Sequence, residues 1–177
     1  PSAVGAPGFH RVAPFALRNQ RGETVTGDTL AGRIYVANFF FSSCNGICPK
    51  MLANLRRVQA AFAADHHVVL VSHTVAPAAD TEAVLRRYAD ANGVLDGKWH
   101  LLTGPRDAIY DLARRSYFAE KRLGLERRPG EFLHTENMFL IDGNGRIRGV
   151  YNATLPADVD RAMDDIRALL REGHEAG

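Results

Sequence analysis

The chain has two cysteines, Cys44 and Cys48, with three residues between them. Two cysteines this close in a chain of 177 residues indicate a shared task, either a redox pair, a metal site or both. One helical turn between them would put their Cα atoms about 6 Å apart, within disulfide range. The same soft thiolates could converge on copper(I) or zinc, and a helix N-terminus beside them would favour thiolate over thiol. The spacing leaves both chemistries open, with two inert buried thiols as the third interpretation.

A third donor would decide between these chemistries, because two thiolates leave zinc or copper(II) short of ligands. His73 ends a predicted strand, and ligands collect outside the carboxyl ends of parallel strands. His134 lies between a charged segment rich in Gly and Pro and a predicted strand that begins at Asn137. The residues alone favour His134 only slightly over His73. The weaker candidates are His10, His66, His67, His100 and His174.

The turn that carries the cysteines lies between a predicted strand and a predicted helix. Residues 34–41 are almost continuously aromatic or β-branched, which is typical of a central strand buried on both faces. Residues 49–64 have apolar side chains at helical spacing, with Pro49 suited to the first turn. An alternating segment over residues 15–26, which turns near Gly22, predicts an N-terminal hairpin.

The rest of the chain repeats strand and helix and then ends in a hairpin and a helix. We expect strands at 68–72, 100–102, 137–141 and 147–151, and helices from Asp80, over 105–117 and over 156–170. Residues 120–130 are charged and contain Gly and Pro, which predicts an exposed, mobile loop. Parallel strands followed by an antiparallel hairpin indicate an α/β sandwich of the thioredoxin type. The three methionines are expected in its core.

Composition and charge narrow the class of protein. We expect one domain over residues 1–177, with residues 1–13 as a flexible N-terminal segment. A formal net charge of +2 is too small for the excess of basic residues that is typical of nucleic-acid-binding proteins, so no nucleic-acid partner is expected. No apolar run approaches the roughly 18 residues of a membrane span. The chain begins at Pro1 with no Met, so we expect either that a targeting or anchor segment has been removed or that the sequence has been trimmed.

Several motifs, in order along the chain, carry a resemblance to a known family. They are Phe39 to Pro49 with its Cys-x-x-x-Cys-Pro element, Pro77 with Asp80-Thr81, Leu102-Thr103-Gly104, His134-Thr135, and Phe139 to Gly145. In this order they resemble the Sco (SenC) family of copper-binding, thioredoxin-like proteins, which help to assemble the dinuclear copper centre of cytochrome c oxidase. The resemblance extends from about Pro14 to the last helix, and the cysteine element is its specific part.

The resemblance implies a ligand set, a partner and a location. Copper, as Cu(I) or Cu(II), would be held by Cys44, Cys48 and His134, which raises His134 above His73. The implied partner is the copper-site subunit of cytochrome c oxidase or another copper chaperone. The implied location is the periplasmic face of a bacterial inner membrane, reached through an anchor, with the mitochondrial inner membrane as the alternative. We expect a monomer.

Two functions from different classes follow. The first is a copper metallochaperone, and the alternative is a thiol-disulfide oxidoreductase that uses Cys44 and Cys48 as its redox pair without His134. A redox or copper sensor ranks last, because the sequence offers no separate output domain. The chain departs from the family pattern at Ala76, where the family usually has Asp, and at Asn45-Gly46 inside the cysteine loop. It also has no proline immediately before Asn137, which argues against a general dithiol reductase.

Overall fold

The computed structural model describes residues 10–44, 46, 48–117 and 135–175. The predicted mobile loop at 120–130 and the candidate ligand His134 lie outside these residues, as does most of the predicted flexible segment 1–13.

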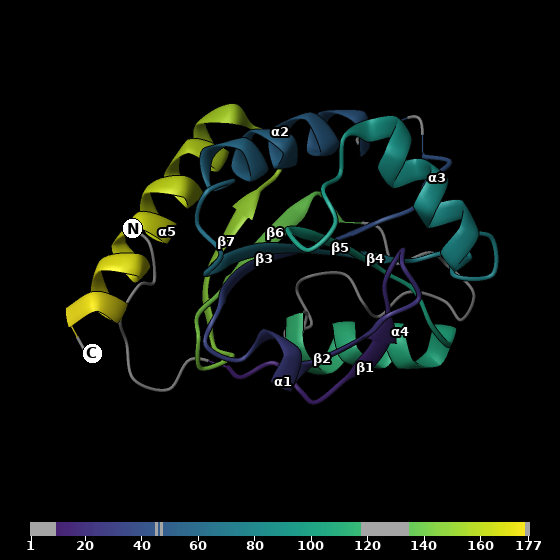
Figure 1. Ribbon diagram of the computed structural model, residues 1–177, viewed down its shortest axis with the longest axis horizontal. Coiled ribbons are helices and arrows are strands. Elements are labelled where there is room, and N and C mark those ends of the chain that lie inside the picture. Colours follow the sequence, from purple (N-terminus) through teal and green to yellow (C-terminus); the bar gives the residue numbers. More distant parts are fainter. Residues whose placement is uncertain (1–9, 45, 47, 118–134, 176–177) are drawn as a thin grey trace.

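The centre of the fold is a five-stranded sheet with the order β5-β4-β3-β6-β7 (Figure 1). Strands β3, β4 and β5 are parallel, whereas β6 and β7 run antiparallel as a hairpin. The bounds are β3 Ile34–Phe40, β4 Val68–Thr74, β5 Trp99–Leu102, β6 Asn137–Ile141 and β7 Ile147–Asn152. A separate two-stranded sheet pairs β1 (Ala16–Arg18) with β2 (Thr24–Thr26). This arrangement confirms the predicted α/β sandwich of the thioredoxin type.

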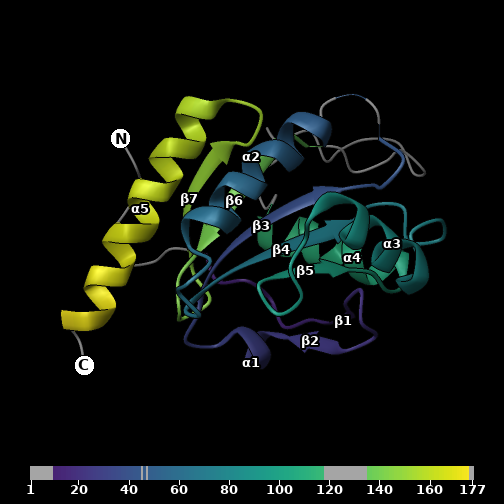
Figure 2. The same ribbon diagram turned by 45° about the horizontal axis from the view of Figure 1, so that its top comes forward.

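Helices cover both faces of the sheet and enclose two apolar cores (Figures 1 and 2). The helices are α1 Gly27–Leu30, α2 Cys48–Ala61, α3 Glu82–Asn92, α4 Arg106–Leu112, a π-helical turn Ala113–Tyr117, and α5 Pro156–Glu175. One core lies between the sheet and α2, α3 and α5, and it contains both cysteines and all three methionines. The other lies beneath α1, α4 and the β1–β2 hairpin.

The N-terminal hairpin closes one edge of the main sheet. It turns at Gly22, whose φ of 75° is a conformation that glycine adopts without strain. The Arg18 N–H donates to the Thr103 carbonyl over 2.9 Å, and the Thr103 N–H donates back over 2.8 Å. Because these bonds lie just after β5, they attach the hairpin to the β5 edge of the sheet.

Two elements differ from their predicted bounds in ways that affect the site. Strand β4 continues for two residues beyond Ser72, so His73 lies inside the strand and not at its end. The helix predicted over 105–117 changes from α to π geometry at Ala113, which turns the buried side chain of Tyr117 into the second core. Within the described residues, no helix is long and apolar enough to cross a bilayer.

Lys98 joins the start of β5 to the loop that precedes β4. Its ammonium donates hydrogen bonds to the carbonyls of Phe62, Asp65 and Val68, over 2.8, 2.6 and 2.8 Å. Hydrogen bonds from a charged donor stabilise a fold by roughly 1.5 to 3 kcal/mol. We therefore expect Lys98→Met to lower the free energy of unfolding in urea by about 2 kcal/mol. Lys50→Met, at an exposed position of α2, is the matched control and should change it by less than about 0.5 kcal/mol.

Candidate metal and redox site

The two cysteines lie where β3 leads into α2. The chain leaves β3 at Phe40, turns through Ser42 and Ser43, and brings Cys44 back against the sheet with a hydrogen bond from the Cys44 N–H to the Phe41 carbonyl (3.1 Å). Cys48 is the first residue of α2. Their exposed fractions are only 9% and 6%, so the site is recessed beneath the surface and still borders the exposed residues of the turn.

No disulfide joins the two cysteines, and their thiols are in contact, since Cys48 is hydrogen-bonded to Cys44. The sequence spacing suggested a contact made by one helical turn that runs from Cys44 to Cys48. The structure makes the contact in a different way. Cys44 precedes the helix and only Cys48 belongs to it, so the turn after β3 folds the first sulfur back onto the start of α2. Pro49 occupies the first turn of the helix, as predicted.

Burial controls the protonation of the pair. Loss of solvation, with a smaller contribution from the hydrogen bond to Cys44, raises the pKa of the Cys48 thiol to about 12, and a hydrogen bond with the Phe41 backbone lowers it only in part. In the metal-free protein burial therefore outweighs the lowering expected from the helix N-terminus, and the Cys48 thiol keeps its proton. Nearby Tyr88, whose ring lies 5.5 Å from that of Phe40, has its pKa raised to about 12, mainly by burial.

A buried carboxylate next to the site ties the cysteine turn to the neighbouring strand. Asp80, which is 2% exposed, accepts hydrogen bonds from the Ser42 N–H (3.0 Å), the Ser42 hydroxyl and the Thr74 hydroxyl (2.6 Å). The sequence suggested Asp80-Thr81 only as a helix start. Thr81 provides that cap by accepting from the Val84 N–H, which leaves Asp80 for the turn. The sequence did hold a signal for the role of Asp80 in the turn. Asp80 and Thr81 are both residue types that cap helices, and a helix needs only one such side chain, so the other is available for a different contact.

Cys48 is positioned by α2, which two buried amide side chains hold in place. Asn54 donates to the Ala153 carbonyl, which precedes α5, over 2.8 Å. Gln59 donates to the Gly93 carbonyl over 2.9 Å and accepts from the Leu95 N–H over 3.0 Å, at the end of α3. These bonds join α2 to its neighbours on both sides, so the position of Cys48 follows from helix packing.

His73 is not near the cysteines, and the hypothesis that it is a ligand is wrong. Residues alternate between the two faces of a strand, and His73 faces the core that lies on the opposite side of the sheet from α2. Its ring stacks on Phe39 at 4.7 Å and meets Tyr117 edge-on at 5.8 Å. Its Nδ1 is hydrogen-bonded to the Asn38 carbonyl at 3.0 Å.

The other histidines with described side chains also lie elsewhere. His100 is buried in β5 and bonded to Asn19, His10 is bonded to the Arg115 carbonyl, and His66 and His67 are exposed before β4. No group of three His, Cys, Asp or Glu residues able to hold a metal ion occurs within the described ranges. Cys44 and Cys48 therefore provide two soft donors, and the sequence-predicted third donor, His134, stays a prediction.

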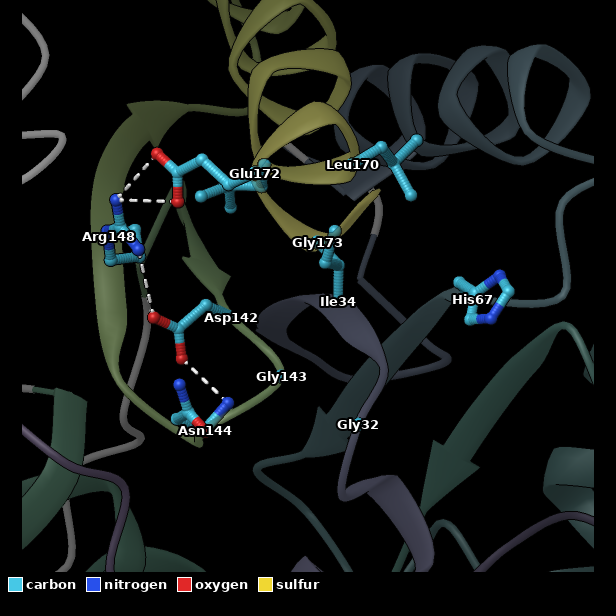
Figure 3. Close-up of a pocket in the computed structure, with 11 residues that line it drawn as sticks. Gly32, Ile34, His67, Asp142, Gly143, Asn144, Arg148, Leu170, Glu172 and Gly173 are labelled. Atoms are coloured by element: carbon cyan, nitrogen blue, oxygen red, sulfur yellow. Dashed lines mark hydrogen bonds and ion pairs between the residues drawn. The ribbon is translucent and has the colours of Figure 1, made fainter. Parts of the chain in front are cut away.

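A cavity in the described part of the chain lies at the start of β3 (Figure 3). Its volume is about 530 Å³, and Gly32, Ile34 and Leu170 are among its lining residues. On one wall, Arg148 pairs with Asp142 at 3.1 Å and with Glu172 at 3.3 Å. Ile34 begins β3 and the cysteine turn follows its end, so the length of the strand, roughly 20 Å, separates this cavity from the thiols. It is not part of the cysteine site.

A family model described as SCO1/SenC matches residues 5–171, which include both cysteines and every helix and strand described above except the end of α5. The chain belongs to the SCO1/SenC family. The resemblance carried by the cysteine element is thereby confirmed at the level of the family.

Three solved structures show how closely the SCO1/SenC fold is shared. A SCO1/SenC family lipoprotein from Bacillus anthracis superposes with a TM-score of 0.81 at 25% identity, over 94% of this chain and 99% of that one. BsSco, described as a Sco-family cytochrome c oxidase assembly protein with a disulfide switch, gives 0.78 at 25% identity, over 94% and 96%. ScoI of Arabidopsis thaliana with copper bound gives 0.68 at 26% identity, over 90% and 98%.

The buried ring of His73 makes the stability of the fold depend on pH. Burial lowers the pKa of His73 to about 4, against about 6.5 for an unfolded chain, so between these values the unfolded state binds more protons. The stabilising contribution is complete above pH 6.5 and is lost as the pH falls towards 4. Urea unfolding should show about 2 kcal/mol less stability from this group at pH 5 than at pH 7.

The matched variant is His73→Phe, which retains an aromatic ring and cannot be protonated. Its own pH dependence between 7 and 5 should be smaller than that of the original protein by about the same 2 kcal/mol. Equal pH dependence in the two proteins would contradict the buried, neutral state of His73.

Proposed function

We propose that this chain is a copper metallochaperone that holds copper through Cys44, Cys48 and His134 and delivers it to, or prepares, the dinuclear copper site of cytochrome c oxidase. The observation that carries the proposal is the pair of recessed thiols, in mutual contact and not joined by a disulfide, at the end of β3. Membership of the SCO1/SenC family directs the choice of metal and partner.

The chemistry of the donor set fits copper. Two thiolates are soft ligands, and copper(I) accepts two or three such donors, whereas a zinc site of this size would be underfilled. Burial disfavours free thiolates, and a bound soft cation compensates for their charge. Binding must displace the thiol protons, so copper affinity should fall in acid. Copper is bound in the related ScoI structure of Arabidopsis thaliana, which supports this choice.

The sheet register supports His134 as the third ligand. Strand β6 pairs antiparallel with β3 so that Met138 lies opposite Asn38. Thr135, the first described residue of this segment, therefore lies at the carboxyl end of β3, from which the chain leads to Cys44. The proposal that His134 is the third ligand uses this position of Thr135, its neighbour in the sequence.

The partner and the location are proposed from the family. BsSco is described as a cytochrome c oxidase assembly protein, and the Bacillus anthracis relative as a lipoprotein. These descriptions support an N-terminal membrane anchor and a role in oxidase assembly. We further propose, from the family resemblance of the sequence motifs, that the chain works as a monomer at the periplasmic face of a bacterial inner membrane and passes copper to the oxidase subunit or to another chaperone.

The alternative function is thiol-disulfide exchange with a partner protein. The contact between the two thiols favours it, because reversible disulfide formation needs sulfurs that can meet, and BsSco is described as having a disulfide switch. The raised pKa of Cys48 disfavours it, because the attacking species in exchange is the thiolate. This function needs Cys44 and Cys48 and does not need His134.

Copper titration tests the ligand set. Cys44→Ser or Cys48→Ser should abolish tight copper binding, because a single thiolate cannot hold the ion. His134→Ala should weaken binding by about 100-fold or more and change the thiolate-to-copper(II) absorption band. His66→Ala, at an exposed position away from the site, is the matched control and should titrate like the original protein.

The His134→Ala variant also separates the two functions. If its copper titration and its absorption band are unchanged, the assignment of His134 is wrong. The oxidoreductase replaces the chaperone as the function of this chain if two results are found together. The original protein retains no copper, and the original protein and His134→Ala reduce a partner disulfide at the same rate.

A further inference from the structure

Asp80 is a buried acid beside the cysteines with no part in the proposed ligand set. Its carboxylate accepts three hydrogen bonds, two of them from Ser42, which lies two residues before Cys44. Asp80 itself is held from behind, because its N–H donates to the Ala76 carbonyl over 2.9 Å. The acid is therefore a fixed point to which the cysteine turn is attached.

The two sulfurs depend on different supports. Cys48 is part of α2, whose packing is fixed by Asn54 and Gln59. Cys44 belongs to no helix or strand, and its N–H donates to the Phe41 carbonyl within the same turn. The bonds from Ser42 to Asp80 connect this turn to β4 and α3.

We propose that Asp80 is a positioning residue that holds the Cys44 sulfur against the Cys48 sulfur by fixing the turn at Ser42, an inference that rests on the proposed function. Copper binding and disulfide formation both require the Cys44 sulfur to lie close to the Cys48 sulfur. Loss of the tie lets the turn sample more conformations, so the effective concentration of one sulfur at the other falls. Both equilibria then weaken together.

A purely electrostatic role for Asp80 predicts the opposite change. A carboxylate near the pair repels the negative charge of two thiolates and so opposes metal binding. If charge were its main effect, neutralising Asp80 would tighten copper binding. The direction of the change therefore distinguishes positioning from charge.

The test variant is Asp80→Asn, which keeps the shape and removes one acceptor oxygen. In one orientation the NH₂ group meets the Ser42 N–H, which can only donate. In the other it meets the Ser42 hydroxyl, which must then accept, and all three bonds lose the charged acceptor that strengthens them. Copper(I) affinity, measured by competition with a chromogenic chelator, should fall by about 10- to 100-fold. In metal-free protein, the equilibrium protein dithiol plus oxidised glutathione to protein disulfide plus two reduced glutathione should shift about tenfold towards the dithiol.

Three further variants separate positioning from general loss of stability. Thr81→Ala removes the cap of α3 and no bond to Ser42, so both equilibria should stay as in the original protein. Ser42→Ala, which removes only the hydroxyl, should give a smaller loss and add little to Asp80→Asn, because both act through one tie. Ser42→Thr keeps the hydroxyl and should behave like the original protein. Ser42→Ala carries the test if Asp80→Asn does not fold.

Several outcomes would overturn the inference. They are unchanged equilibria in Asp80→Asn, tighter copper binding in that variant, or equal losses in Thr81→Ala. Failure of the proposed function is distinguishable from these outcomes. If the original protein binds no copper, the chaperone assignment falls, and the glutathione equilibrium of the metal-free protein still reports whether Asp80 positions the sulfurs.

Discussion

The parallel pairing of β3 with β4 determines where every part of the site lies. Phe40 is paired with Thr74, and the Val75 N–H continues the ladder to the Phe40 carbonyl over 2.8 Å. The loops that leave the two strands therefore start side by side. One loop carries Cys44, and the other carries Asp80, so the hydrogen bonds between Ser42 and Asp80 are local in space although 38 residues separate them in sequence.

Burial gives the cysteine pair its chemical character. In the metal-free protein the raised pKa of Cys48 keeps its thiol protonated, because an unpaired thiolate in this recess would lack both solvent and a counter-charge. A soft cation changes this balance by providing the counter-charge directly. The site thus favours metal-bound thiolates over free ones, which suits capture and transfer of an ion better than general attack on disulfides.

The sequence carried enough information for the fold and for the identity of the cysteine pair. Strong apolar runs at β3 and β4 and helical spacing in α2 determined the order of layers, because burial on both faces of a strand leaves a clear pattern. The face on which His73 lies was not predictable in the same way. A continuous apolar run does not show where a strand ends, and a strand two residues longer placed this ring in the opposite core. The family resemblance, which favoured His134, agreed with the structure in rejecting His73.

The contact between the sulfurs arises from two independent supports and not from one helical turn. Spacing alone suggested a local explanation, in which Cys44 and Cys48 share a helix. In the structure Cys48 is held by α2, whereas Cys44 is held by the turn that is attached to the carboxyl ends of β3 and β4. Such a site is sensitive to any shift of α2 against the sheet, because the shift changes the distance between the sulfurs directly. The buried amides of Asn54 and Gln59 oppose that shift, so polar groups far from the thiols contribute to their geometry.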